Sequence, residues 1–153
     1  MKKALILENI RSAYNVGNII RTADALGYDV ILAGYSPSPF ENPKVVKSSL
    51  WAEKSVNIKT FYNPVEALSY AKKEYWYLVW AEITDDAIDI DEWKKLIENQ
   101  NWFAVVFWNE VDWVTLETLE KLDKVFFIPM KWTKESLNVC EAAAIFMYAL
   151  QSC

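Results

Sequence analysis

The residues best placed to hold a ligand lie near the end of the chain, between positions 127 and 150. An apolar strand end at 127–130 leads into a polar loop and then into a helix start at Asn138. Asn138 can cap this helix, and Glu141 can reach back to it as in a capping box. A polar loop that opens a helix offers backbone N–H groups and side-chain amides to a ligand. This stretch is therefore the first candidate binding site, although an ordinary strand–loop–helix unit would show the same pattern.

Three long segments of the chain carry a more specific pattern. They read NIRSAYNVGNIIRTADALG at 9–27, FWNEVDWV at 107–114 and IPMKWTKESLN at 128–138. In content and order they resemble the three signature motifs of the TrmH (SpoU) branch of the SPOUT RNA methyltransferases. The motifs cover nearly the whole chain, which on this resemblance is identified as a member of that family.

The resemblance implies an enzyme that transfers a methyl group from S-adenosylmethionine to a ribose 2′-hydroxyl of tRNA or rRNA. It places the methyl donor against backbone at the ends of the fifth and sixth strands and at the start of the last helix. By motif position, the cofactor contacts fall at Trp108, Ile128, Met130, Leu137 and Asn138. No metal is expected, because the sulfonium of the donor is already a good leaving group.

The polar residues that match the functional positions of the family are Asn15, Arg21, Glu110, Ser136 and Asn138. The planar guanidinium of Arg21 suits a bidentate hold on the target phosphate. Glu110 and Asn138 fit a role in fixing loop geometry, and ordinary loop capping would explain them equally. Because the chain has no histidine, the general base stays open among Arg21, Glu110 and an RNA phosphate.

The chain has a net charge of −5 and a pI of about 4.8, so its overall charge disfavours binding to the phosphates of RNA. Phosphate contacts need a local basic patch. Arg11 and Arg21 in the first motif and Lys44 and Lys47 in the middle of the chain are the candidates, although a solvated charged face would also explain the lysines. We therefore expect weak intrinsic RNA affinity, with a dimer combining two modest patches.

Tryptophan replaces glycine at several positions of the family pattern. Trp108 and Trp113 stand in the second motif and Trp132 in the third, while Trp51 and Trp80 extend the series. The chain has eight Trp and three Gly, far from average usage. Because glycine serves where backbone approaches a ligand closely, we expect the indoles of Trp108 and Trp132 to intrude on the cofactor. The alternative function is therefore a catalytically impaired or inactive knotted homologue, RNA-binding or structural only, with its pocket occluded.

Length and composition indicate one domain over residues 1–153, long enough for a single core. The longest uncharged apolar run, 142–150, is far short of the roughly 20 residues that span a membrane. No signal peptide is expected, and Cys140 and Cys153 are too few for a disulfide framework or a metal site. A cytoplasmic protein without a membrane partner follows.

Strand-like and helix-like segments alternate along the chain. Strands are expected at 4–7, 29–34, 56–61, 76–81, 103–107 and 125–128. Helix caps are expected at Asn15, Asn63, Thr115 and Asn138, and Leu96 is expected to face inward from a short helix. This alternation predicts a parallel α/β sheet of about six strands with helices on both faces. The resemblance adds a C-terminal deep trefoil knot and a homodimer built on the first and last helices. A dinucleotide-binding fold is a weaker alternative, since no G-x-G-x-x-G turn is present.

Overall fold

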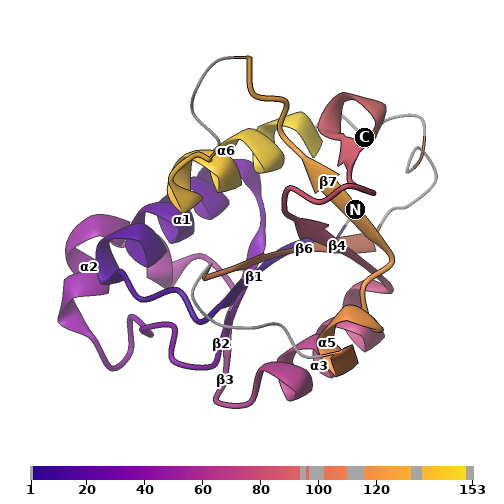
Figure 1. The fold of residues 1–153 in the computed structure, drawn as a ribbon. Coiled ribbons are helices and arrows are strands. Elements are labelled where there is room, and N and C mark those ends of the chain that lie inside the picture. The colour runs from indigo at the N-terminus through magenta and orange to yellow at the C-terminus, as the bar shows by residue number, and fades with distance from the viewer. Residues whose placement is uncertain (1, 94–95, 97–101, 110–115, 132–135, 151–153) are drawn as a thin grey trace.

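The computed structural model describes residues 2–93, 96, 102–109, 116–131 and 136–150. Over these residues, seven strands form one sheet in the order β3-β2-β1-β6-β4-β7-β5, and all pairings are parallel (Figure 1). The strands are β1 (Lys2–Glu8), β2 (Asp29–Ala33), β3 (Ile58–Phe61), β4 (Tyr77–Ala81), β5 (Ile88–Asp89), β6 (Trp102–Trp108) and β7 (Lys124–Phe127). The predicted parallel α/β sheet is confirmed, with one strand more than expected. The additional strand, β5, has two residues, too few for any periodic signal.

Helices cover both faces of this sheet (Figure 1). The helical segments are α1 (Ala13–Leu26), α2 (Pro43–Ser49), α3 (Pro64–Tyr75), α5 (Leu116–Leu119) and α6 (Val139–Ala149), with short 3₁₀ turns η1 (Ala52–Lys54) and η2 (Ile90–Glu92). α1 and α6 lie side by side on one face, with α2 beyond α1, and α3 and α5 lie on the other. No helix in the described part of the chain has the length and apolar character needed to cross a bilayer.

The core has two layers because neighbouring strand residues point to opposite faces of the sheet. The layer under α1 and α6 includes Leu5, Leu7, Val105, Phe107, Ile20, Phe146 and Met147. The layer under α3 includes Ala4, Ile6, Ala104, Val106, Leu68 and Ala71. Central strands such as β1 and β6 are therefore buried on both sides, which accounts for their continuous apolar sequences.

Two predictions about helical residues need correction, one on the cap of α1 and one on the burial of Leu96. α1 begins at Ala13, and its cap is Ser12, whose hydroxyl accepts a hydrogen bond from the Asn15 backbone N–H at 3.2 Å. The prediction that Asn15 caps this helix is wrong, because Ser12 starts the helix three residues earlier and leaves the Asn15 side chain for other contacts. Leu96 is 51% exposed and does not face inward, whereas Trp93 beside it is buried.

Of the remaining cap predictions, two are confirmed and one cannot be compared with the structure. Asn63 caps α3 and Asn138 caps α6, as predicted, each accepting from the backbone N–H two residues on. Gly27 ends α1 in the left-handed conformation, with φ of 71°. The predicted cap at Thr115 lies outside the described residues. The predicted C-terminal knot would depend on segments that include residues outside the described ranges, so it stays a prediction.

Candidate active site

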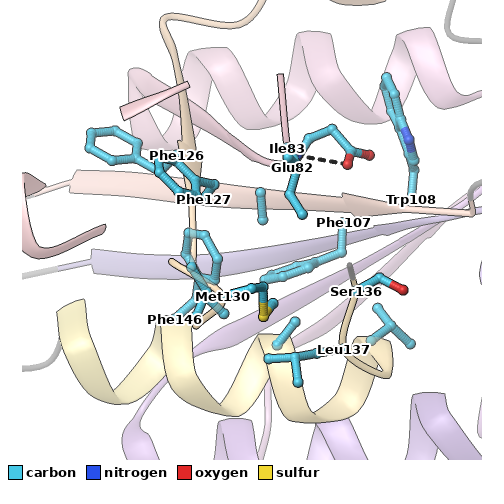
Figure 2. A pocket seen from close by; sticks show the side chains of 14 residues that line it. Glu82, Ile83, Phe107, Trp108, Phe126, Phe127, Met130, Ser136, Leu137 and Phe146 are labelled. Carbon is cyan, nitrogen blue, oxygen red and sulfur yellow. Dashed lines mark hydrogen bonds between the residues drawn. The ribbon is translucent and has the colours of Figure 1, made fainter. Parts of the chain in front are cut away.

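A small, mostly apolar cavity lies where the carboxyl ends of β4, β6 and β7 meet the start of α6 (Figure 2). Its volume is about 100 Å³, and its walls include Phe107, Phe126, Ile128, Met130, Leu137 and Phe146. This is the edge of a parallel sheet at which ligands usually bind, because strand ends there leave room for loops. Phe107 and Phe146 meet edge to face, with ring centroids 5.5 Å apart, and form a rigid part of the wall.

The cavity brings together the residues expected to contact a cofactor. Trp108, Ile128, Met130 and Leu137 all line it, although the first two lie twenty positions apart in the sequence. Asn138, the fifth predicted contact, lies in the groove next to the cavity, where its side chain caps α6.

The orientation of Trp108 differs from the expected one. Phe107 points toward α6, so its neighbour Trp108 must point to the other face of β6, and Figure 2 shows its indole extending away from the cavity. There it packs on Trp80, with ring centroids 4.0 Å apart and planes tilted by 50°. This orientation does not support the expectation that the indole intrudes on the cofactor space, although Trp108 is among the residues that line the cavity. Trp113 and Trp132 lie outside the described residues.

A polar groove adjoins the cavity and shares Trp108, Ser136, Leu137 and Val139 with it. Three residues predicted to be catalytic, Asn15, Ser136 and Asn138, line this groove together. Glu110, also predicted to be catalytic, lies outside the described residues. The groove thus places polar groups of the first and third motifs at the mouth of an apolar cavity.

The side chain of Asn15 is held by a cysteine of α6. The Cys140 thiol donates a hydrogen bond to Asn15 Oδ1, with a sulfur–oxygen distance of 3.1 Å. Burial raises the pKa of the Cys140 thiol, so the thiol stays protonated near neutral pH and remains a donor. Because Oδ1 of Asn15 is engaged in this way, its amide N–H groups are left to donate elsewhere in the groove.

A basic groove lies between α1 and α2. Arg21, Lys44 and Lys47 line it together with Asn18, so three of the four residues predicted to bind RNA converge in space. Gly17 makes this possible, since a β-carbon there would lie 2.4 Å from the Val45 carbonyl oxygen of α2. Arg11, the fourth, lines the polar groove instead. Arg21 and Asn15 therefore occupy different grooves of the same helix.

A sequence model described as the SpoU rRNA Methylase family matches residues 2–148. The chain belongs to this family.

Relatives within the SpoU family match nearly the whole of this chain, which covers only part of their own length. The chain is 27% identical over 98% of its length to the 23S rRNA (guanosine(2553)-2′-O)-methyltransferase RlmP of Bacillus subtilis, and covers 58% of that protein. It is also 27% identical over 95% of its length to the tRNA (guanosine(18)-2′-O)-methyltransferase of Escherichia coli, and covers 61% of it. The SpoU methyltransferase AviRb of Streptomyces viridochromogenes, solved in complex with the cofactor AdoMet, superimposes with a TM-score of 0.80. That match has 25% identity and covers 98% of this chain and 59% of AviRb. The chain thus spans about three fifths of the length of these proteins.

Three residues of this candidate site were not predicted from the sequence. Cys140 and Cys153 are too few for a disulfide framework or a metal site, yet Cys140 orients Asn15. Tyr35 accepts hydrogen bonds from Asn109 Nδ2 at 2.8 Å and from Arg11 Nε at 3.4 Å, and so joins the loops after β1, β2 and β6. Asn109 carried a signal, since it belongs to the second motif, whereas nothing in the sequence marked Tyr35. Across the described ranges, no group of three or more potential metal ligands converges.

Proposed function

We propose that this chain is an RNA methyltransferase that uses S-adenosylmethionine to methylate a ribose 2′-hydroxyl of tRNA or rRNA. The observation that carries the proposal is the junction between the apolar cavity and the polar groove, built from all three motifs. Two of the relatives named above are RNA guanosine 2′-O-methyltransferases, and the AviRb complex contains AdoMet. These findings support the same reaction for this chain.

The residues present fit the cofactor. An apolar cradle of Ile128, Met130 and Leu137 suits the adenine and ribose and keeps water out, which is typical of small-molecule sites. A volume of about 100 Å³ is less than the roughly 300–1,000 Å³ of typical ligand pockets, so part of the ligand must extend into the adjoining polar groove. When bound, the cofactor supplies a methyl group on a positively charged sulfur. Ser136 and Asn138 stand where the cavity opens into the groove, and we assign them the positioning of the groups at that mouth.

We assign the target ribose to the polar groove. Asn15, fixed by the Cys140 thiol, is placed to donate from its amide nitrogen to an oxygen of the ribose. The proton of the attacking hydroxyl goes to a base that we leave among Arg21, Glu110 and an RNA phosphate. The basic groove of Arg21, Lys44 and Lys47 supplies the local positive surface that a chain of net charge −5 needs for phosphates.

We further propose that the chain acts as a cytoplasmic homodimer with a knotted C-terminal part, as the family resemblance implies. α1 and α6 pack against each other, and α6 exposes Ile145 and Tyr148 beyond the face that it buries. Exposed apolar groups on a helix with a buried face favour a partner on the outer side. A dimer would also bring the basic grooves of two chains into one assembly.

The inactive alternative rested on the indoles of Trp108 and Trp132. The Trp108 indole points away from the cavity and does not support it, and Trp132 lies outside the described residues. The deciding experiment incubates the chain with S-adenosylmethionine labelled in its methyl group and with unmodified tRNA or rRNA. Digestion to nucleosides should recover the label as a 2′-O-methylnucleoside, and Arg21→Ala should lower the rate strongly. Absence of labelled nucleoside from both RNA classes would refute the proposed activity.

A further inference from the structure

A second hollow lies at the carboxyl ends of β1, β2 and β3, beside the strands that form the cavity. We call it the aromatic cleft, and its walls include Asn9, Tyr35, Ser38, Glu41, Thr60 and Tyr62. Its volume is about 790 Å³, far larger than the cavity at β6 and β7. Of the residues to which a role was assigned above, only Tyr35 lines this cleft among the residues that the structure describes.

The loop that forms one wall is held firmly in place. The Ser36 hydroxyl donates to the Leu7 carbonyl at 2.7 Å and accepts from the Ile10 N–H at 2.8 Å. Asn9 Oδ1 accepts from the Tyr35 backbone N–H at 3.2 Å. Gly34 has φ of 67°, and a β-carbon there would lie 1.9 Å from Asn9 Oδ1, so a larger residue would be strained and would displace the Asn9 side chain. The wall is thus preorganised, which reduces the entropy lost when a ligand binds.

The cleft presents aromatic rings that are exposed yet oriented. The side chain of Tyr62 is 79% exposed, and its hydroxyl donates to Glu41 Oε1 at 3.1 Å. Tyr35 is 48% exposed and is fixed at its hydroxyl by Asn109 and Arg11. The guanidinium of Arg11 lies over the Tyr35 ring, 5.9 Å from its centroid, whereas the largely exposed Tyr62 ring is suited to stacking against a planar group. Proteins that read single-stranded RNA use aromatic side chains in this way.

The cleft is linked to the proposed reaction site through hydrogen bonds of Tyr35. Tyr35 lines the cleft, while its partners Arg11 and Asn109 line the polar groove that adjoins the cavity. A strand whose target ribose lies in the polar groove would therefore pass Arg11 and reach the cleft with its next nucleotide. The cation at this junction suits the intervening phosphate. The carboxylate of Glu41 repels phosphate and instead accepts N–H groups from a base edge.

We propose that the aromatic cleft binds the base of an unpaired nucleotide adjacent to the methylated one, stacked on Tyr62 with an amino group directed to Glu41. The assignment rests on the proposed function, which it deepens by defining a site for the flanking nucleotide. Adenine, guanine and cytosine carry the required amino group, and uracil does not. Glu41 is thus the residue that determines base specificity, and Tyr62 supplies the stacking affinity; both lie outside the three motifs.

The test measures binding of a fluorescein-labelled single-stranded RNA and methyl transfer to unmodified tRNA and rRNA. Tyr62→Ala should weaken RNA binding about 5- to 100-fold, the loss measured for base stacking on aromatic residues. Tyr62→Phe keeps the ring and should stay close to wild type. Trp76→Ala removes an aromatic ring of similar exposure at the opposite end of the sheet and should not change RNA affinity. All three variants should bind S-adenosylmethionine as the wild type does.

The outcomes separate this proposal from the proposed function. If methyl transfer occurs and Tyr62→Ala has wild-type RNA affinity, the cleft assignment fails alone. If no methyl transfer occurs but Tyr62→Ala still weakens RNA binding, the assignment of the cleft to RNA is supported and the proposed reaction is refuted. A wild-type chain that binds none of these RNAs would refute both. Equal affinity for strands with uridine or adenosine next to the target would overturn the assignment of Glu41.

Discussion

Replacement of Gly17 by alanine should separate α1 from α2 and distort the basic groove between them. Gly17 is buried, and a β-carbon added there would lie 2.0 Å from the Ser48 hydroxyl oxygen and 2.4 Å from the Val45 carbonyl oxygen. The hydroxyl can rotate away, but the carbonyl belongs to the backbone of α2. To bring that contact from 2.4 Å to ordinary contact at 3.4 Å, α2 must shift by about 1 Å.

The size of the effect follows from two opposing terms. Overpacking of this kind costs about 1–3 kcal/mol, and the upper end applies because backbone must move. Alanine in place of glycine within a helix returns about 1 kcal/mol. The net loss of about 2 kcal/mol should lower the melting temperature by about 4–8 °C for a chain of this size. Since Lys44 and Lys47 lie on α2, RNA affinity should fall as well.

Urea and thermal unfolding, followed by circular dichroism, measure this loss beside a matched control. Gly27→Ala makes the same chemical change where nothing lies within 4 Å of the new β-carbon but φ is +71°. It should cost about 1–2 kcal/mol through backbone strain alone and leave RNA affinity unchanged. A Gly17→Ala chain as stable as the wild type, or one with undiminished RNA affinity, would refute the close helix contact and its role.

Three further predictions follow from the site and its surroundings. Trp108→Gly should leave the dissociation constant for S-adenosylmethionine, measured by calorimetry, within about threefold, since the indole packs on Trp80 and points away from the cavity. A tenfold or greater tightening would restore the occlusion hypothesis. In a Cys153→Ser background, Cys140 should react with iodoacetamide at pH 8 more slowly than a free thiol, because burial raises the pKa of its thiol above the ordinary 9.0. The stability contributed by the protonated thiol is then lost as pH rises through the folded-state pKa. A reaction rate equal to that of a free thiol would contradict this prediction. Trp51→Gly should raise the free energy of unfolding by about 1 kcal/mol. The substitution relieves about 1–2 kcal/mol of backbone strain at φ of 77° and loses roughly 0.5–1 kcal/mol of contact between the indole and the Lys54 ammonium. A lower melting temperature would show that the strain is absent.

Much of the fold is readable from the sequence because local chemistry and burial agree. The apolar runs that became β1 and β6 are buried on both faces, and Asn63, Asn138 and Gly27 set helix ends by their own geometry. β5 was missed because its two residues gain their strand conformation from pairing with β7.

The motifs name candidate site residues, but they do not predict how these residues are arranged in space. Arg21, Lys44 and Lys47 could be named separately, but only the packing of α2 on Gly17 places them in one groove. The orientation of Trp108 could not be predicted, because motif position says nothing about which face of a strand a side chain takes. Tyr35 and Tyr62 follow two different strands and share no motif, so the aromatic cleft emerges only from the sheet order β1–β2–β3.

The most direct test of the central claim titrates S-adenosylmethionine into the wild-type chain and into Ala142→Phe by calorimetry. Ala142 lines the cavity from α6, so a phenyl ring there would fill the proposed cofactor space. We predict one binding site per chain in the wild type and no measurable binding in the variant, with circular dichroism spectra that coincide. Absence of binding to the wild type, or equal binding to both chains, would contradict the assignment of this cavity to the methyl donor.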